Sequence, residues 1–224
     1  KKDLKIIAEN HNTLIETLNN NSTGSLIDKA NSAPKYFKTV ARSKTDLAAL
    51  LYTSGTTGKS KGAMLTQANL LSNGNVLMSE WQFSKNDVLL HALPLFHTHG
   101  LFVATNVILA AGGSIMFLPK FNLDEIIKQL PKCSAMMGVP TFYTRLLADD
   151  RFNKRLVEHM RLFVSGSAPL LSETHIQFEK ITGHRILERY GMTETNMNTS
   201  NPYNGERRAG TVGHPLPGVD LKII

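Results

Sequence analysis

A loop rich in hydroxyls, glycines and lysines follows a short apolar segment, and this composition suits the binding of phosphate. The apolar segment covers residues 46–52, and residues 53–62 read Thr-Ser-Gly-Thr-Thr-Gly-Lys-Ser-Lys-Gly. Glycines let the backbone approach an anion closely, and successive loop N–H groups can form an anion-binding nest. The loop is not a Walker A motif, which needs a glycine five residues before Gly58, where this chain has Thr53. The alternative is an exposed turn that binds no ligand. The other segments of the chain are therefore needed to distinguish a phosphate-binding loop from such a turn.

Three further segments carry polar and aromatic residues in patterns that could serve a nucleotide and an acid. They are Leu93-Pro-Leu-Phe-His-Thr-His-Gly100, Ser165-Gly-Ser-Ala-Pro-Leu170 and Glu188-Arg-Tyr-Gly-Met-Thr-Glu-Thr195. Together with residues 52–62, and in this order, they resemble the motifs of the adenylate-forming superfamily. That superfamily includes acyl-CoA synthetases, the adenylation domains of peptide synthetases and luciferases. The chain is therefore identified as a member, and the resemblance covers nearly all of it.

The resemblance implies an ATP site with magnesium. Tyr190 would stack on adenine opposite residues 166–168, Thr193 would donate to the α-phosphate, and Glu194 would bind Mg²⁺. The expected ATP-binding residues are Thr53, Ser54, Gly55, Thr56, Thr57, Gly58, Lys59, Lys61, Gly166, Ser167, Ala168, Glu188, Arg189, Tyr190, Gly191, Met192 and Thr193. Thr53, Lys61, Thr193 and Glu194 form the expected catalytic set. The alternatives are a surface acid for Glu194 and a core aromatic for Tyr190.

The resemblance also implies a two-step reaction. A carboxylate would first join the α-phosphate of ATP and expel pyrophosphate, and the thiol of coenzyme A would then attack the acyl-adenylate. ATP and coenzyme A are thus the expected co-substrates and Mg²⁺ the expected cofactor. Chemistry of this kind depends mostly on positioning and on neutralising charge.

The acid substrate is expected in a pocket formed by His97, Gly138, Arg145, Ser165 and Met192. Arg145 shares a helix face with Thr141, and a guanidinium pairs with a carboxylate through two parallel hydrogen bonds. Arg145 and His97 together would suit a small acid with a second carboxylate, although a solvated arginine is the alternative. A zinc site at His97 and His99 is disfavoured, since zinc needs three or four ligands.

Within the superfamily, His97-Thr-His-Gly100, the Pro140-Thr-Phe-Tyr-Thr-Arg145 segment and residues 190–200 most resemble malonyl-CoA synthetases, which activate malonate or methylmalonate. Two alternatives stay open at this point. The first is a ligase for another short acid, and the second is a nucleotide-binding homologue without catalysis.

Composition limits the partners. The chain has 224 residues, 42% of them hydrophobic, and no apolar run near the ~20 residues of a membrane-spanning helix. Its net charge of +7 is spread without the aromatic interleaving of single-strand binders, so small anions rather than nucleic acid are expected. One cysteine, Cys133, suits a structural thiol in a reducing compartment, the cytoplasm or, in a eukaryote, the mitochondrial matrix. The oligomeric state does not follow from the sequence.

Alternating apolar and helical patterns predict an α/β fold with mainly parallel sheets flanked by helices. We expect strands at residues 46–52, 88–93, 114–118, 135–139, 162–164, 185–188 and 219–224. We expect helices within residues 4–18, from Thr66, and at residues 101–111, 122–130, 141–147 and 171–182, with a loop at residues 19–33. Ligands bind at the carboxyl ends of such strands, where the loops after Tyr52, Val139, Val164 and Glu188 should meet.

The resemblance also suggests how the chain is organised. Residues 1–45 are expected to be an incomplete αβ edge element with a connection, and residues 46–224 the core of an AMP-binding domain. This core is expected to be truncated at both ends. The small C-terminal lid domain of the superfamily, with its catalytic lysine, is expected to be absent.

Overall fold

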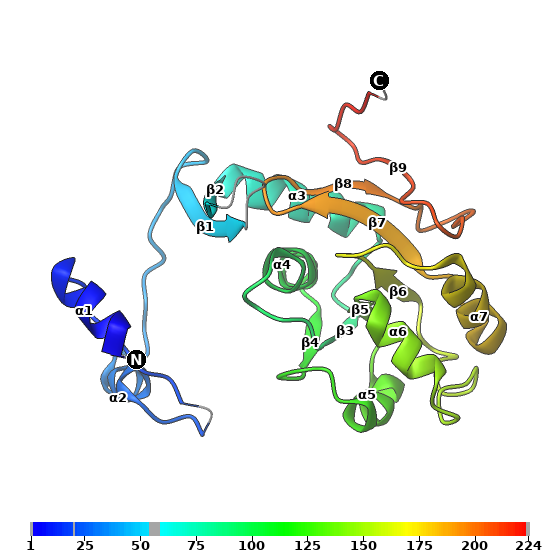
Figure 1. The fold of residues 1–224 in the computed structure, drawn as a ribbon, viewed down its shortest axis with the longest axis horizontal. Helices are drawn as coiled ribbons and strands as arrows, with labels where there is room; N and C mark the ends of the chain where they lie inside the picture. Colours follow the sequence, from blue (N-terminus) through cyan, green and yellow to red (C-terminus); the bar gives the residue numbers. More distant parts are fainter. Residues whose placement is uncertain (1, 20, 54–58, 223–224) are drawn as a thin grey trace. The chain divides into compact units, whose positions relative to one another are not determined.

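The computed structural model of the chain describes residues 2–19, 21–53 and 59–222 (Figure 1). Its packing divides into two units, Lys1–Ala41 and Arg42–Ile224. The boundary that we inferred after residue 45 concerns domains, and it stays a prediction. Among the described residues, every helix is too short or too polar to cross a membrane.

The first unit contains two short helices, α1 (Lys2–Asn10) and α2 (Ser25–Ser32), and none of its described residues is buried. α1 covers the first part of the expected helical stripe. The expectation of a loop throughout residues 19–33 was wrong, because α2 lies within it. The Asn and Ser residues of that stretch flank Leu26, Lys29 and Ala30, which are good helix formers.

The second unit begins with a two-stranded antiparallel sheet. β1 (Leu47–Thr53) pairs with β2 (Lys61–Thr66) in the register Thr53 to Lys61. The strand expected at residues 46–52 is confirmed. We had expected it to join the parallel strands, and this was wrong, because it pairs only with β2 among the described residues. The connection between β1 and β2 is short, and a parallel pair would need a crossover of a dozen or more residues.

A seven-stranded sheet forms the centre of this unit, in the order β4-β3-β5-β6-β7-β8-β9. Its strands are β3 (Val88–His91), β4 (Ser114–Phe117), β5 (Ala135–Gly138), β6 (Leu162–Ser165), β7 (Leu187–Met192), β8 (Asn196–Ser200) and β9 (His214–Pro215). From β4 to β7 all neighbours are parallel. The mainly parallel sheet that the sequence predicts is therefore confirmed.

The end of this sheet differs from the prediction. β7 continues past Glu188 to Met192 and turns back into antiparallel β8, which pairs with β9. The expected loop directly after Glu188 was therefore wrong. Residues 219–222 also do not form the expected strand, and residues 223–224 lie outside the described residues. Gly218, with a φ of 82°, turns the chain just before this segment.

Helices connect the strands where the sequence predicts them. They are α3 (Gln67–Glu80), η1 (His99–Ala104, π-helical), α4 (Thr105–Ala110), α5 (Leu123–Gln129), η2 (Leu130–Lys132, 3₁₀), α6 (Pro140–Leu147) and α7 (Ser172–Thr182). The predicted N-cap of α3 is confirmed. Thr66 Oγ1 accepts a hydrogen bond from Asn69 N at 3.2 Å, and Thr66 N donates to Asn69 Oδ1 at 2.9 Å, which forms a capping box.

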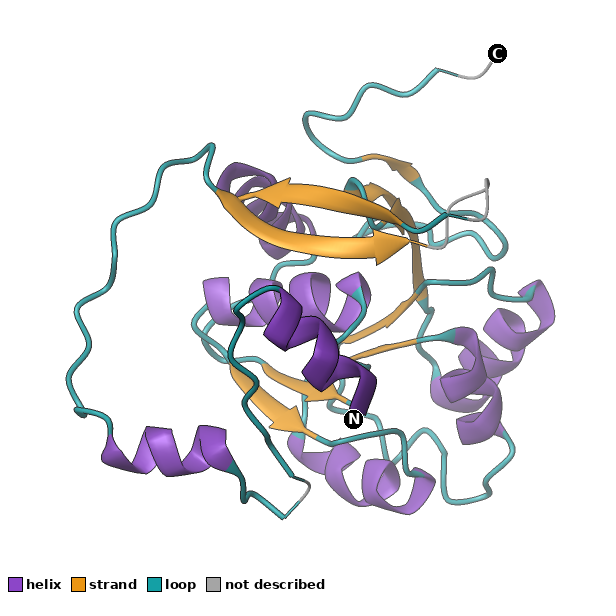
Figure 2. Ribbon diagram, turned by 60° about the vertical axis from the view of Figure 1, so that its left-hand side comes forward, coloured by secondary structure: helices purple, strands orange, loops and turns teal. Residues whose placement is uncertain are grey.

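The order of the strands determines which side each helix covers. The chain moves from β3 outward to β4, then crosses back over β3 to β5 and continues to β6 and β7. Because such crossovers are right-handed, α4 should lie on one side of the parallel strands and α5, α6 and α7 on the other. Figures 1 and 2 show this arrangement. The strand order therefore reverses between β3 and β5.

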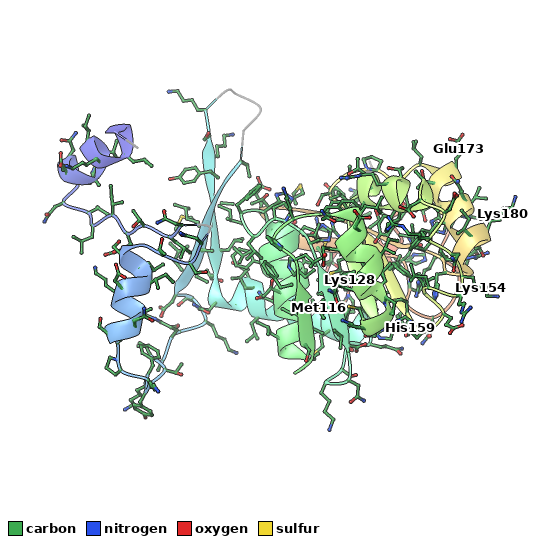
Figure 3. All side chains as sticks on the ribbon, turned by 90° about the horizontal axis from the view of Figure 1, so that it is seen from below. Met116, Lys128, Lys154, His159, Glu173 and Lys180 are labelled. Atoms are coloured by element: carbon green, nitrogen blue, oxygen red, sulfur yellow. The ribbon has the colours of Figure 1, made fainter. Side chains whose placement is uncertain are left out.

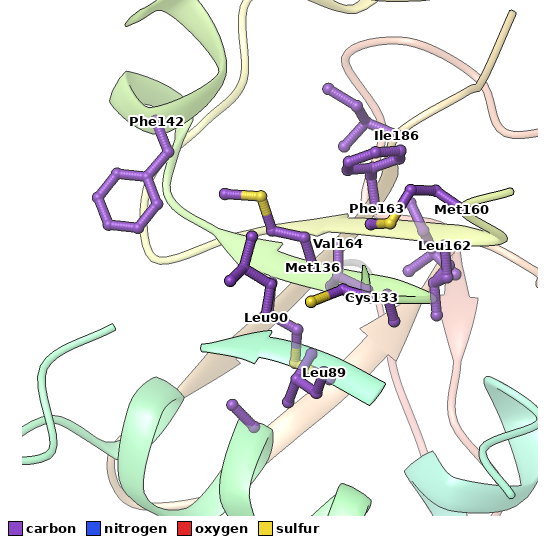
Figure 4. Packing of buried hydrophobic residues seen from close by; sticks show 14 of the residues in the cluster. Leu89, Leu90, Cys133, Met136, Phe142, Met160, Leu162, Phe163, Val164 and Ile186 are labelled. Carbon is purple, nitrogen blue, oxygen red and sulfur yellow. The ribbon is translucent and has the colours of Figure 1, made fainter. Parts of the chain in front are cut away.

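The core lies between these helices and the parallel strands. Leu90 of β3, Met136 of β5 and Phe163 of β6 are neighbours in register and almost fully buried, and Leu89 is buried as well (Figure 4). Phe178 of α7 contacts Phe163 edge to face, with ring centroids 5.0 Å apart. Charged side chains such as Lys154, Glu173 and Lys180 extend away from this core into solvent (Figure 3). The apolar runs of the sequence thus become the buried strands.

A partly buried ion pair holds the amino ends of the parallel strands together. Asp87, just before β3, accepts hydrogen bonds from Arg161 Nε at 2.6 Å and Arg161 Nη2 at 2.9 Å. It also accepts from Ser134 Oγ at 2.7 Å and Ser84 N at 2.8 Å. Burial alone would raise the pKa of Asp87, but the hydrogen bonds from Arg161, Ser134 and Ser84 together lower it below its usual value.

We expect Asp87→Asn to lower the free energy of unfolding by about 3 kcal/mol at pH 7, because it leaves the Arg161 charge without its partner. A carboxyl whose pKa is lowered on folding stabilises the fold above its unfolded pKa of about 3.9, and this contribution is lost as the pH falls through the folded value. Urea denaturation at pH values from 7 to 2 measures both effects. The two proteins should converge in acid, and a gap that stays constant with pH would contradict this role.

Candidate functional site

The carboxyl ends of the parallel strands place three predicted site residues side by side. Gly138 ends β5 and pairs in register with Ser165, which ends β6, and Ser165 pairs with Glu188 of β7. All three residues are buried. The loop that follows β3 carries the histidine segment, residues 93–100. These ends lie beside the reversal of strand order, where sheets of this kind bind their ligands.

A cavity of about 310 Å³ lies beside these strand ends. Its walls include the predicted residues Ser165, Ser167, Ala168, Glu188, Arg189, Tyr190 and Gly191. The structure thus brings together two segments whose first residues, Ser165 and Glu188, are 23 positions apart in the sequence. Tyr190 is 46% exposed, which excludes the alternative of a core aromatic.

The sequence reasoning missed Gly210 and Val212 of this cavity, whereas Pro169 and Leu170 belong to the Ser165–Leu170 segment without having been predicted as site residues. Gly210 and Gly213 have positive φ values of 74° and 77°. A Cβ at Gly213 would lie 2.0 Å from the carbonyl oxygen of Ser200, so only glycine fits there. Two such glycines in a polar loop were the signal that could have revealed this wall.

Glu188 is buried and already paired. Its Oε1 accepts hydrogen bonds from His175 Nδ1 at 3.2 Å and from Gly210 N at 3.2 Å. Its carbonyl oxygen accepts a further bond from Asn201 Nδ2 at 3.1 Å. Glu188 therefore holds the Gly210 loop against β7, at the edge of the cavity. Its predicted contact with a nucleotide stays a prediction.

The two histidines after β3 differ from each other. His97, which we expected to border the acid, is exposed, whereas His99 is buried with its Nδ1 3.1 Å from Ser167 Oγ. Burial, and then the nearby charge of Arg189, lower the pKa of His99 well below its usual value. His99 is therefore neutral at pH 7. His99, rather than His97, thus contacts Ser167, which lines the 310 Å³ cavity.

Arg145 is not buried as we had expected. It lies in the last turn of α6 and is exposed, and its guanidinium carbon lies 4.3 Å from the centroid of the Phe121 ring. The inward reach that we inferred from helical spacing was wrong in this structure. Stacking on an aromatic face keeps the charge in place while leaving it in contact with water.

The predicted phosphate loop connects β1 to β2. Thr53 ends β1, and its Oγ1 donates to the carbonyl oxygen of Lys61 at 3.5 Å. Lys59 and Lys61 are exposed. Five of the predicted residues lie outside the described residues, namely Ser54, Gly55, Thr56, Thr57 and Gly58.

Thr193 and Glu194 lie in the turn between β7 and β8. Glu194 is exposed and lines a second cavity, of about 530 Å³, together with Asn73 and Asp220. Tyr190 and Glu194 therefore face two different cavities of the same hairpin, although we had expected one common rim. Gly191 lets this hairpin close, because a Cβ there would lie 1.9 Å from the carbonyl oxygen of Asn196.

The remaining predicted residues line the strand ends. Met192 ends β7 and is 41% exposed. Gly166 is buried, and its N–H donates to the carbonyl oxygen of Gly138 at 3.2 Å.

Cys133 is buried, and burial raises its pKa to about 11, which agrees with a structural thiol.

Comparisons with known proteins give a family. The sequence model of the family described as AMP-binding enzyme matches residues 2–224. A malonate–CoA ligase of Arabidopsis thaliana is 42% identical over 198 residues, which cover 80% of this chain and 33% of that protein. This chain therefore spans about a third of the length of the curated relatives that it matches.

Solved structures agree with this family. The ATP-bound crystal structure of MatB from Rhodopseudomonas palustris shares 57% identity with a TM-score of 0.92, covering 96% of this chain and 43% of that one. A malonyl-CoA ligase in a ternary product complex with methylmalonyl-CoA and AMP shares 44% identity with a TM-score of 0.75, covering 79% and 39%. The fold described above is thus the fold of these enzymes over the matched region.

Asn73 ties the hairpin to α3, since its Nδ2 donates to Met197 O at 2.8 Å and its Oδ1 accepts from Met197 N at 3.2 Å. We expect Asn73→Ala to lower the free energy of unfolding by about 1–2 kcal/mol more than Asn75→Ala does. Asn75 is exposed on the same helix, so both variants gain the same helix propensity. Urea denaturation gives the difference, and equal stabilities would mean that the two hydrogen bonds contribute nothing.

Proposed function

The chain belongs to the AMP-binding enzyme family, and from this premise we propose that the protein is an AMP-forming acid–CoA ligase that acts on malonate or methylmalonate. We also propose that residues 46–224 contribute the core of its adenylation domain, next to an edge element formed by residues 1–45. The observation that carries this proposal is the 310 Å³ cavity, where the segment from Ser165 faces Tyr190 and Gly191.

The proposed reaction has two steps. A carboxylate oxygen of the acid attacks the α-phosphorus of ATP, the bond from this phosphorus to the bridging oxygen breaks, and pyrophosphate leaves. The sulfur of coenzyme A then attacks the acyl carbon, the bond to the AMP oxygen breaks, and the thioester forms. Both steps require that reacting groups are held close together and that charge on the phosphates is offset.

The residues of the site suit these tasks. The exposed ring of Tyr190 would stack on adenine, with Ser167 and Ala168 across the cavity. Lys59 and Lys61 would offset the phosphate charge from the β1–β2 hairpin. Thr193, in the turn after β7, would donate a hydrogen bond to the α-phosphate.

Magnesium is the proposed cofactor, and Glu194 would bind it. The described residues contain no cluster of three or more side chains that could hold a metal ion by themselves. Mg²⁺ usually binds one or two carboxylates and completes its coordination with water and phosphate oxygens, so a single exposed carboxylate fits an ion that arrives with the nucleotide. When bound, such an ion neutralises charge on the phosphates.

Malonate is the proposed acid for two reasons. Two of the relatives reported above are named as a malonate–CoA ligase and a malonyl-CoA ligase. Arg145, exposed over Phe121, and His97 also offer polar groups to a second carboxylate. A fatty acid would instead need an apolar lining at these positions.

We expect Glu194→Gln to lower the rate of ATP–pyrophosphate exchange by roughly 10²–10³-fold with every acid, the range for losing one charge-stabilising group. The assay uses the complete protein with malonate, methylmalonate and butyrate. Glu173→Gln is the control, because Glu173 is an exposed acid on α7 away from the cavities. Wild-type exchange activity in Glu194→Gln would show that this carboxylate does not take part in the reaction.

We expect Arg145→Ala to lower kcat/KM for malonate by roughly tenfold, as for one exposed charged hydrogen bond, with a smaller effect on butyrate. Arg145→Lys should restore only part of the loss, because an ammonium lacks the planar fork. Arg155→Ala, another exposed arginine, serves as the control. An equal loss on malonate and butyrate would contradict a carboxylate-binding role for Arg145.

A further inference from the structure

The helix that follows the histidine segment begins with a π-helical turn, η1, before it continues as α4. At the end of η1 the backbone N–H of Thr105 donates to the carbonyl oxygen of Gly100, five residues earlier. Such a turn is wider than an α-helical turn, and π-helical segments are rare and often lie at functional sites. The contacts that hold this turn are therefore candidates for a functional role.

His91, the last residue of β3, holds the same carbonyl oxygen. Its Nε2–H donates to Gly100 O at 2.9 Å, and Thr105 Oγ1 donates to this oxygen at 2.9 Å as well. His91 is buried, and burial lowers the pKa of His91, so the ring is mostly neutral at pH 7. Gly100 also packs tightly, because a Cβ there would lie 2.2 Å from the carbonyl oxygen of Pro94. The start of η1 is thus fixed against the end of β3.

His99 is the first residue of η1 and connects this turn to the 310 Å³ cavity. The side chain is buried, and its Nδ1 lies 3.1 Å from Ser167 Oγ. Ser167 lines the cavity and has a φ of 69°, in the left-handed region that residues other than glycine rarely adopt. A conformation of this kind persists only where neighbouring contacts hold it. The hydrogen bond with His99 is such a contact.

We propose that His91 and His99 are positioning residues for the nucleotide. His91 fixes η1 through Gly100 O, η1 sets the position of His99, and His99 holds Ser167 in its left-handed conformation at the wall of the cavity. Neither imidazole ring lines this cavity, so both act through Ser167. The inference rests on the proposed function, under which the nucleotide binds in this cavity with Tyr190.

The alternative is that the hydroxyl of Ser167 contacts the nucleotide directly and that its backbone conformation is unimportant. Substitution by glycine or alanine distinguishes the two cases. Both remove the hydroxyl, but only glycine adopts a positive φ without a steric cost. A positioning role through the backbone therefore predicts different ATP affinities for Ser167→Gly and Ser167→Ala, whereas a direct contact predicts equal losses.

The test measures the affinity of the complete protein for ATP by titration calorimetry. His91→Leu and His99→Leu are each made in the wild-type and in the Ser167→Gly background. His91→Gln is the conservative variant, because an amide N–H can still donate to Gly100 O. His184→Leu is the matched control, since His184 also bonds a backbone carbonyl, Val157 O at 3.0 Å, and packs against a phenylalanine, but does not line the cavity.

We expect His91→Leu and His99→Leu each to weaken ATP binding by roughly tenfold, as for the loss of one buried hydrogen bond. In the Ser167→Gly background the same changes should weaken binding by less than about twofold, because glycine holds a positive φ without a partner. His91→Gln should recover most of the affinity that His91→Leu loses. His184→Leu should lower the free energy of unfolding, measured in urea, and keep the wild-type affinity for ATP.

Three results would overturn the inference. The first is an equal effect of His99→Leu in both backgrounds, which would mean that His99 does not act through the conformation of Ser167. The second is ATP binding by Ser167→Ala that is as tight as binding by Ser167→Gly. The third is a loss of ATP affinity in His184→Leu as large as that in His91→Leu, which would indicate a general loss of structure.

Thr105→Val provides a second route to the same carbonyl if His91→Leu does not fold, as judged by circular dichroism. It removes a donor to Gly100 O and keeps the shape of the side chain. Its expected effects on ATP affinity have the same direction in both backgrounds, and wild-type affinity in Thr105→Val would then contradict a role for this carbonyl. Absence of ATP binding by the wild-type protein would instead refute the proposed function.

Discussion

Strand order reverses between β3 and β5, and the position of the candidate site depends on this reversal. Parallel strands require crossover connections, and right-handed crossovers send α4 to one side of the sheet and α5, α6 and α7 to the other. The loops that leave β3 and β5 therefore diverge at the carboxyl edge, where sheets of this kind bind their ligands. Gly138 and the segment of His97 and His99 belong to these two loops. Topology brings them to the same edge although 38 residues separate Gly100 from Gly138.

The same edge contains two buried charged residues, one with hydrogen-bond partners and one without them among the described residues. Glu188 and Arg189 are neighbours on β7, so their side chains point to opposite faces of the sheet. Glu188 finds His175 and the N–H of Gly210, and its pairing fixes one wall of the cavity. Arg189 finds no anion among the described residues. A buried carboxylate with hydrogen-bond partners inside the protein serves the structure, whereas a buried cation without them is better explained by a ligand.

Local signals explain which parts could be predicted from the sequence. Thr66 and Asn69 form a capping box, which is a short-range pattern, and α3 begins where that pattern predicts. The runs of Leu89, Met136 and Phe163 are apolar throughout, as strands buried on both faces must be. Element types in the parallel part of the sheet were therefore correct.

The wrong predictions concern contacts between residues that are distant in the sequence, which a local sequence pattern does not encode. The antiparallel pairing of β7 with β8 depends on Gly191, which allows the backbone of Asn196 to approach. The exposure of Arg145 depends on Phe121, which comes from a distant segment and provides a stacking surface. The pairing of Glu188 with His175 likewise depends on a residue of another element, the helix α7. A sequence motif identifies candidate residues, but tertiary packing determines which of their side chains remain free to bind a ligand.

The hairpin of β7 and β8 shows how packing prepares a site. Its second strand is attached at three places, by Asn73 of α3 to Met197, by Thr98 to Asn196 at 2.8 Å, and by the indole N–H of Trp81 to Ser200 at 2.9 Å. These three partners come from different segments, so the strand has little freedom to shift. The turn that carries Glu194 therefore projects from a rigid base, and both cavities share the same wall. Under the proposed function, a fixed hairpin of this kind would present Tyr190 on one side and Glu194 at the turn without a further rearrangement of the strands.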